Sequence, residues 1–305
     1  ARLARGQALF AKSNNREEEF CQMNNKTLNR WITRIFGILA ELRLPTFLQE
    51  PVNKAVVAAL KIDLSEHEPI SHYASVNELF TRPLTRPRDV DLNADSLIAP
   101  TDATLIASGI VRDNQALQIK GISYSVSALL AQSLEPHELQ SIEGMRFFNL
   151  YLAPCDYHRF HAPTDLRIVS IAYCDGNLSS VRPNVLRKSP VFVSNERVIL
   201  RALDSRGNPF YFVAVGALNV GKILIYAEPR IHTNAAHGAT IYYYDKPISM
   251  QKAQELGQFK MGSSIVLLAK ARCNVQESAP VRFGQCIGNL GDDHDDTTRN
   301  QQPQK

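Results

Sequence analysis

The chain has 305 residues, of which 44% are hydrophobic and 21% charged, and its net charge is +4 at pH 7. This composition is typical of a globular protein that can bury a sizeable core, and the mild positive charge does not by itself indicate nucleic-acid binding. No apolar run reaches the roughly 20 residues that a membrane span needs. Five cysteines without regular spacing argue against a disulfide framework and favour a reducing compartment.

The N-terminal part begins with a polar lead, residues 1–26, for which disorder is left open. Thr27 is a candidate N-cap for a helix with apolar residues at three- and four-residue spacing from Leu28 to Leu42. Arg30 and Arg34 lie off the apolar stripe. Such a basic amphipathic helix can lie in a membrane interface or pack on the protein core.

Two further helices are predicted before residue 96. One runs from Pro51 to Leu60, and the other begins at a capping box formed by Ser75 and Glu78, with Pro83 after its end. Residues 27–95 are therefore expected to form a helical region.

From residue 96 the pattern changes to short β-like segments separated by turns. The segments are Leu97–Ala99, Leu117–Ile119, Phe147–Leu152, Val191–Val193, Arg197–Leu200, Phe210–Val215 and Ile223–Tyr226, with one short helix near Ser125–Ala131. Residues 96–287 are predicted to form a mainly antiparallel β domain, so the fold class is α+β. The polar, Asp-rich residues 288–305 predict a disordered tail.

The segment Met261-Gly262-Ser263-Ser264 precedes the apolar run Ile265–Leu268. A serine hydroxyl can attack the carbonyl before it, and a preceding glycine permits the strained turn that this attack requires. Elimination of the resulting ester leaves a pyruvoyl group on the downstream fragment. Ser264 is less favoured, because cleavage before it would place serine on the acyl side. The tetrapeptide alone is a weak signal.

A serine hydroxyl needs a base, and the segment Tyr151–Pro163 contains two histidines, His158 and His161. An aspartate can fix the tautomer of such an imidazole and stabilise its cation. The segment Pro100–Ala103 supplies Asp102. Acid, base and nucleophile therefore follow in the order Asp, His, Ser.

Together these motifs resemble those of the phosphatidylserine decarboxylases. The similarity runs from about Leu28 to Gly284, and its most specific part is Tyr157–His161. It also includes Asn77–Leu84, Lys120–Ser125, Asn195–Val198, Val215–Gly221 and Gly257–Lys260.

The chain departs from the family pattern in three places. The family's Ala-Asp-Gly is Thr101-Asp102-Ala103 here, and its Gly-Ser-Thr ends in Ser264. The segment Ile231–Gly238 has no close match. If the turn at Ala103 required a positive φ, alanine would cost on the order of 1 kcal/mol there.

The resemblance implies a self-processing proenzyme that is cleaved between Gly262 and Ser263. Ser263 would be the nucleophile and pyruvoyl precursor, His161 the base and Asp102 its orienter. The fragments 1–262 and 263–305 would form a heterodimer, and a dimer of this pair is possible.

The resemblance also implies the reaction and the location. The pyruvoyl group would form a Schiff base with the amine of phosphatidylserine in a membrane and absorb the electrons released as CO2 departs, which leaves phosphatidylethanolamine. The protein would be a peripheral membrane protein on the cytoplasmic face of the cell membrane, with the helical region 27–95 as its membrane-associating part. No nucleic-acid partner is expected.

The segment Tyr151–Pro163 contains further residues whose roles can be inferred. His158 is favoured for substrate binding or decarboxylation over a structural hydrogen bond. No metal is expected, because prolines bracket the segment and no carboxylate pair completes a site. Arg159 could bind phosphate, but an ion pair with a nearby acid is favoured. For Cys155, a packing role is favoured over a reactive thiol.

Two alternatives remain open. A pyruvoyl-dependent decarboxylase of a soluble amino acid would use the same scaffold with the Leu28–Leu42 helix packed inward. An unprocessed lipid-binding relative would not be an enzyme, although Asp102, His161 and Ser263 are all present.

Overall fold

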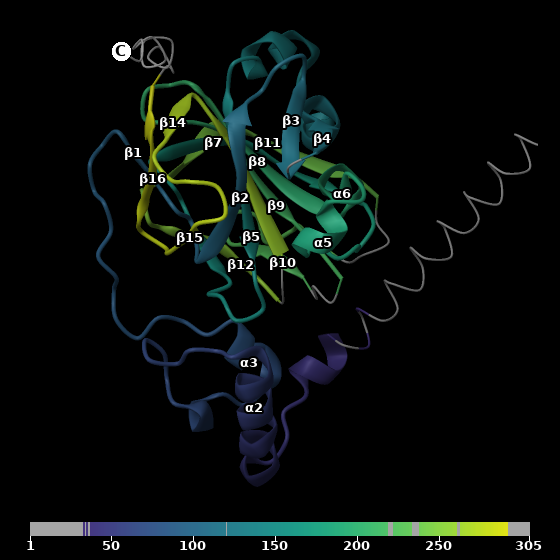
Figure 1. Cartoon of the computed structure of the whole chain (residues 1–305), viewed down its shortest axis with the longest axis vertical. Coiled ribbons are helices and arrows are strands. Elements are labelled where there is room, and N and C mark those ends of the chain that lie inside the picture. The colour runs from purple at the N-terminus through teal and green to yellow at the C-terminus, as the bar shows by residue number, and fades with distance from the viewer. Residues whose placement is uncertain are drawn as a thin grey trace, which may run out of the picture.

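The computed structural model describes residues 33, 35, 37–119, 121–218, 222–233, 238–260 and 263–291. Helices of the N-terminal region lie at one end of a larger, mainly antiparallel β domain (Figure 1). The α+β fold class predicted from the sequence is confirmed. The predicted helix start at Thr27 lies outside the described residues.

The N-terminal region is helical, as predicted, but its boundaries differ. Residues 37–41 are helical, α2 spans Thr46–Leu60, the 3-10 turn η1 spans Ile70–His72 and α3 spans Val76–Phe80. Helix α2 thus begins before the predicted start at Pro51, which lies inside it. The Ser75 side chain accepts a hydrogen bond from the Glu78 amide (3.1 Å), but the Glu78 carboxylate accepts from the Ala74 amide, so only half of the predicted capping box forms.

An eight-stranded antiparallel sheet forms the centre of the β domain, in the order β11-β7-β8-β9-β13-β5-β2-β15. The strands are β2 Ala103–Ile110, β5 Arg146–Leu152, β7 Leu166–Cys174, β8 Arg197–Leu203, β9 Pro209–Val215, β11 Thr240–Met250, β13 Ser263–Ala269 and β15 Pro280–Val281. Every residue of β13 is buried, because this strand lies between β5 and β9 with side chains packed on both faces.

Smaller sheets and short helices surround the central sheet. The sheets are β1 Ser96–Ile98 with β16 Cys286–Leu290 and β14 Ala271–Cys273; β10 Ile223–Ile225 with β12 Glu255–Phe259 and β6 Arg159–His161; and β3 Gln115–Ile119 with β4 Ile122–Ser125. The helices are α4 Val126–Leu130, η2 Ala131–Ser133, η3 Pro136–Ile142, α5 Pro183–Leu186 and α6 Val191–Ser194.

Two predictions from the sequence are wrong. The apolar run Val191–Val193 is not a strand but the start of the short helix α6, because the Gln118 side chain accepts from the Phe192 amide (3.0 Å) and the Asn195 amide donates to the Val191 carbonyl (2.9 Å). The predicted tail beginning at 288 also starts too early. Strand β16 continues to Leu290, held between β1 and β14, and residues 292–305 lie outside the described residues.

Candidate active site

The three motifs meet at one end of the central sheet. Ser263 opens β13 opposite Leu152, the last residue of β5, and Tyr151 pairs both with Ser264 and with Thr104 in β2. Neighbouring strands lie about 5 Å apart, so the start of β2, which follows Asp102, lies two strands from Ser263. The connection from β5 to β6, which carries His158, leaves the sheet at this same end, and His161 is the last residue of β6.

Ser263 is fully buried, and its hydroxyl has no hydrogen-bond partner among the described residues. The same holds for Ser264. An unpaired buried hydroxyl costs about 1–3 kcal/mol. Such a group is a candidate for chemistry, and the role of Ser263 as the nucleophile stays a prediction. Gly262 lies outside the described residues.

His158 is fully buried and neutral. Its Nδ1 lies 2.8 Å from the Asp156 carbonyl, which can only accept, so Nδ1 carries the proton and Nε2 presents a lone pair. Among the described residues that lone pair has no partner. Burial lowers the pKa of His158 to about 3. The Phe259 amide donates to the His158 carbonyl (3.0 Å), which places this histidine beside the end of β12, close in sequence to Ser263.

His161 has both ring nitrogens engaged. Nδ1 donates to the Ala253 carbonyl (2.9 Å), so Nε2 accepts from the hydroxyl of Tyr157 (3.0 Å). The imidazole stacks on Phe283 with ring centroids 3.8 Å apart. Burial lowers the pKa of His161, so the neutral form is favoured at neutral pH, as a general base requires.

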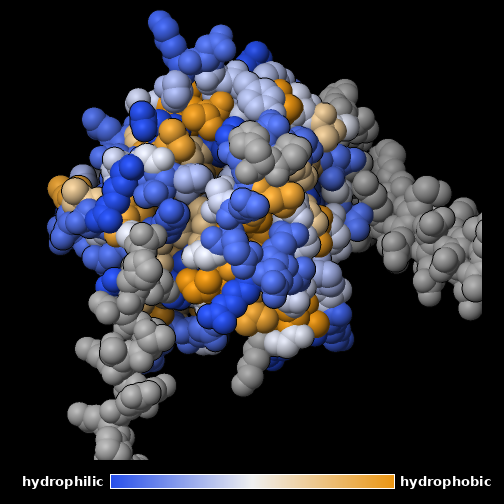
Figure 2. All heavy atoms as spheres, turned by 90° about the horizontal axis from the view of Figure 1, so that it is seen from above, coloured by the Kyte–Doolittle hydropathy of each residue, from blue (hydrophilic) through white to orange (hydrophobic). Residues whose placement is uncertain are grey.

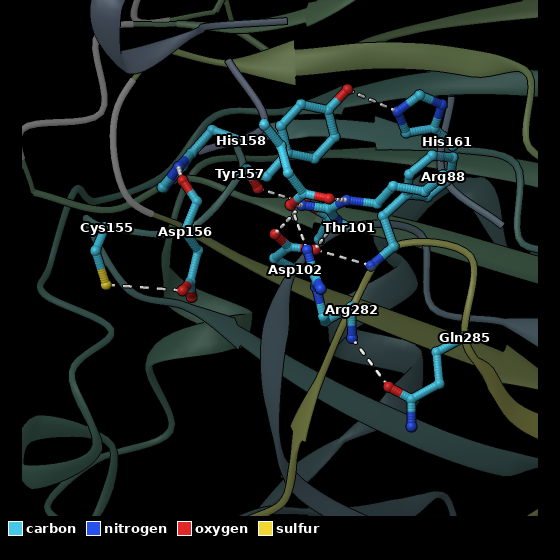
Figure 3. A network of polar contacts seen from close by, with 12 residues as sticks. Arg88, Thr101, Asp102, Cys155, Asp156, Tyr157, His158, His161, Arg282 and Gln285 are labelled. Atoms are coloured by element: carbon cyan, nitrogen blue, oxygen red, sulfur yellow. Dashed lines mark hydrogen bonds and ion pairs between the residues drawn. The ribbon is translucent and has the colours of Figure 1, made fainter. Parts of the chain in front are cut away.

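Asp102 forms an ion pair with Arg88, with N–O distances of 2.5 and 3.0 Å, and accepts from the Phe283 amide (2.8 Å). No hydrogen bond joins its carboxylate to His161 within the described part of the chain. The connection is indirect, because the Arg88 guanidinium lies 5.7 Å from the centroid of the Tyr157 ring, whose hydroxyl meets His161 (Figure 3). The orienting role of Asp102 stays a prediction.

The departure from the family pattern at Ala103 has a simple structural outcome. Ala103 is the first residue of β2 and is not among the described residues with positive φ. Alanine at this position therefore causes no backbone strain.

Residues beside the two histidines bear on the predictions made for Arg159 and Cys155. Arg159 pairs with Glu255 (3.0 Å), which confirms the ion pair expected from the sequence. Burial raises the pKa of the Cys155 thiol, which disfavours the reactive thiolate. Burial also raises the pKa of Asp156 to about 6. In the described part of the chain, no group of three or more His, Cys, Asp or Glu side chains could hold a metal ion.

Sequence reasoning missed the partners that the site takes from elsewhere in the chain. Arg88, which also pairs with Glu66, comes from the segment after α3, and Phe283 comes from the segment before β16. Their roles depend on contacts between distant parts of the chain. The sequence shows only that Arg88 is charged and that Phe283 is apolar, and neither property identifies a partner in the fold.

This fold and arrangement of motifs define a class: an α+β protein in which a buried serine and two buried histidines lie towards one end of an antiparallel sheet. A sequence model of the phosphatidylserine decarboxylase family matches residues 76–289. The chain belongs to this family.

Individual relatives agree with that assignment. The chain is 42% identical over 266 residues to a phosphatidylserine decarboxylase proenzyme of Helicobacter pylori, which covers 86% of this chain and 97% of the relative. The corresponding proenzyme of Campylobacter jejuni is 36% identical over 265 residues, or 84% of this chain and 97% of the relative. The mitochondrial proenzyme of Cricetulus griseus is 31% identical over 294 residues, or 86% of this chain and 72% of the relative.

Proposed function

We propose that this chain is a phosphatidylserine decarboxylase proenzyme, which cleaves itself between Gly262 and Ser263 and then converts phosphatidylserine to phosphatidylethanolamine and CO2. The observation that supports this most is the buried, unpartnered hydroxyl of Ser263 at the end of the sheet where the histidine segment begins. The names of the relatives, which are proenzymes of this activity, agree with it.

Cleavage begins when the Ser263 hydroxyl attacks the Gly262 carbonyl carbon while a neutral histidine takes its proton. The peptide C–N bond breaks, which leaves an ester at the hydroxyl and a free amine on residue 263. Removal of the Cα proton then breaks the Cβ–O bond, and Gly262 leaves as a carboxylate. The dehydroalanine takes up water and releases ammonia, which gives the pyruvoyl group.

The two histidines differ in suitability as the base. The pKa of His158, lowered to about 3, makes it a weak base for a hydroxyl, although its free Nε2 can accept a hydrogen bond from substrate. His161 is linked to Asp102 through Phe283, whose amide donates to the Asp102 carboxylate and whose ring stacks on the His161 imidazole. We therefore keep His161 as the base, Asp102 as its orienter and His158 as a substrate-binding or decarboxylation residue.

The surroundings of residue 263 fit a pyruvoyl group. The position is fully buried, and the His158 lone pair lacks a protein partner among the described residues. The pyruvoyl carbonyl would supply an electron sink for the loss of CO2. Because β13 pairs with both β5 and β9, the fragment 263–305 would stay bound to fragment 1–262 after cleavage as a heterodimer. We also propose that two such heterodimers associate with each other, and we assign no particular surface to that contact.

An apolar helical surface favours a lipid over a soluble amino acid as the substrate. We define this surface by the large apolar side chains that are exposed between residues 35 and 52, on two helical segments and the loop between them: Ile35, Ile38, Leu39, Leu42, Leu44, Phe47, Leu48 and Val52. Contiguous exposed apolar side chains mark interaction surfaces. The opposite end of the molecule is mainly hydrophilic, with small hydrophobic patches (Figure 2).

These observations support binding to the surface of a membrane, and we propose the cytoplasmic face of the cell membrane. No helix in the described part of the chain is both long and apolar enough to cross a bilayer. The apolar helical surface would instead lie in the interface.

The test is the intact mass of the purified protein beside Ser263→Ala and His161→Ala variants, followed by an assay for CO2 release from phosphatidylserine vesicles and from free serine. We expect two fragments, 1–262 and a blocked 263–305, in the wild type alone, with activity on vesicles. An active preparation that contains one uncleaved chain would exclude the pyruvoyl mechanism. Activity on free serine alone would favour the soluble-substrate alternative.

A further inference from the structure

Arg82 is a buried cation whose hydrogen bonds are incomplete. Its side chain is 2% exposed, and its Nη2 donates to the carbonyls of Cys155 (2.7 Å) and Asp156 (3.2 Å). Its Nε and Nη1 have no partner among the described residues. Burial lowers its pKa, which reflects the unfavourable environment of the charge. A buried ionised group with unmade hydrogen bonds is costly unless a ligand completes them.

Arg197 is a buried arginine with a structural role only, and its hydrogen bonds serve as a comparison for those of Arg82. It is buried to a similar extent, and each of its guanidinium nitrogens donates to a backbone carbonyl: Nε to Leu129 (2.7 Å), Nη1 to Val193 and Asn195 (both 3.0 Å), and Nη2 to Ala128 (2.7 Å). Arg82 therefore differs from Arg197 in its unsatisfied donors rather than in its depth.

The acids near Arg82 are already engaged. The Asp102 carboxylate pairs with Arg88, and the Asp156 carboxylate accepts from the Ala153 amide (2.7 Å). Within the described residues, neither forms an ion pair with Arg82. The nearby Arg282, by contrast, pairs with Glu66. Of Arg82, Arg88 and Arg282, Arg82 is the one whose unpaired donors are buried, because the side chain of Arg282 is largely exposed and its remaining donors face solvent.

Arg82 also lines a cavity of about 510 Å³ between the N-terminal region and the histidine segment. Other residues that line this cavity include Lys61, His67 and Asp102. The neighbouring Thr81 carbonyl accepts from Arg159 Nε (2.9 Å), which connects this segment to β6. The cavity adjoins the loop that carries His158, because Cys155 and Asp156 also line it.

We propose that Arg82 binds the phosphodiester group of the lipid headgroup in this cavity, an inference that rests on the proposed decarboxylase function. The substrate carries two anions, a phosphodiester and a carboxylate. A cation paired with the carboxylate would stabilise the group that must leave as neutral CO2, and would therefore oppose the reaction. The phosphodiester keeps its charge from substrate to product, and arginine suits phosphate oxygens. Arg82 is thus a substrate-binding residue whose contact is equal in the ground and transition states.

A binding experiment in the Ser263→Ala background tests this without requiring cleavage. The probes are glycerophosphoethanolamine, which has the phosphodiester but no carboxylate, serine, which has the carboxylate but no phosphate, and inorganic phosphate. We expect Arg82→Gln to weaken glycerophosphoethanolamine binding at least tenfold and to leave serine binding unchanged. Equal binding to both proteins would overturn the proposal, and so would a loss confined to serine. If inorganic phosphate binds through Arg82 and glycerophosphoethanolamine does not, the assignment of Arg82 to the lipid headgroup is overturned.

Arg82→Lys keeps the proposal testable where Arg82→Gln fails to fold, because lysine keeps the charge and can reach the Cys155 carbonyl. In the cleaved enzyme we expect Arg82→Lys to raise KM for phosphatidylserine vesicles several-fold with little change in kcat, as loss of uniform binding predicts. A lowered kcat with unchanged KM would contradict the proposal. If the wild type does not cleave but its Ser263→Ala form still binds glycerophosphoethanolamine through Arg82, the decarboxylase function fails and the anion site stands.

Discussion

The hydroxyl of Tyr157 lies 3.0 Å from Nε2 of His161 and is the donor in this contact, because Nδ1 of the same ring donates to the Ala253 carbonyl. The lone pair that would take the Ser263 proton is therefore occupied in this structure. For His161 to act as the base, the Tyr157 hydroxyl has to release it. Self-cleavage should then depend on this hydrogen bond.

Tyr157→Phe should free Nε2 of His161. We expect self-cleavage at least as fast as in the wild type, because the stacking of the ring is kept and only the competing donor is lost. The loss of one buried hydrogen bond should lower stability by about 1 kcal/mol. The measurement is the appearance of the 263–305 fragment over time by mass spectrometry.

The matched control is Tyr124→Phe, which removes a buried hydroxyl bonded to Asn149 (3.2 Å). This change should not alter the cleavage rate. A tenfold slower cleavage in Tyr157→Phe alone would mean that the Tyr157 hydroxyl itself takes part in the proton transfer.

The buried, neutral His158 should make the folded protein less stable in acid. Its pKa is about 3 in the folded protein and near 6.5 in the unfolded chain, so below pH 6.5 the unfolded chain binds a proton that the folded protein does not. Stability is therefore lost as the pH falls from about 6.5 towards 3. Between pH 7.5 and pH 5 this histidine should cost the fold about 2 kcal/mol.

Thermal melts of Ser263→Ala, with and without His158→Gln, measure this effect at pH 7.5 and pH 5. Glutamine can still donate to the Asp156 carbonyl but does not titrate. We expect the drop in Tm between the two pH values to be smaller when His158 is replaced. An equal drop in both proteins would mean that His158 is not buried as a neutral ring.

Asp156 should have the opposite pH dependence. Burial raises its pKa from an ordinary 3.8 to about 6, so the folded protein holds the proton more tightly than the unfolded chain does. Its contribution is favourable below pH 3.8 and is lost as the pH rises through 6. Asp156→Asn should therefore stabilise the protein at pH 7.5 by on the order of 2 kcal/mol, with little gain near pH 4. Urea unfolding of the Ser263→Ala form at both pH values provides the measurement, and no gain at pH 7.5 would contradict the raised pKa.

The sequence points to those parts of the proposed site that lie within short motifs. Ser263 and the two histidines are recognisable because the chemistry requires a glycine, a hydroxyl and a base within short segments. Arg82, Arg88 and Phe283 could not be assigned, because their partners lie far away in sequence and are brought close only by folding. The same reason explains the error at Val191–Val193, where the Gln118 side chain, distant in sequence, bonds to the helix that replaces the predicted strand.

Ala103 stands at a position where the family pattern has glycine. Because Ala103 is not among the described residues with positive φ, glycine offers no conformational advantage there. We expect Ala103→Gly to leave the cleavage rate within twofold of the wild type and to lower stability by roughly 0.5–1 kcal/mol, since glycine loses more backbone entropy on folding. Faster cleavage in Ala103→Gly would show that the family's glycine serves a conformation of the proenzyme other than this one.

The apolar helical surface makes a prediction about membrane binding. Phe47 is 75% exposed in α2, and transfer of a phenylalanine side chain out of water is worth roughly 1.5–3 kcal/mol. Phe47→Asp should therefore weaken binding to phosphatidylserine-containing vesicles at least tenfold, as measured by sedimentation or by the fluorescence of the single tryptophan, Trp31. Leu92 is 78% exposed outside the N-terminal helices, so Leu92→Asp is the matched control and should bind like the wild type. Equal losses in the two variants would mean that the surface between residues 35 and 52 is not the part that contacts the lipid.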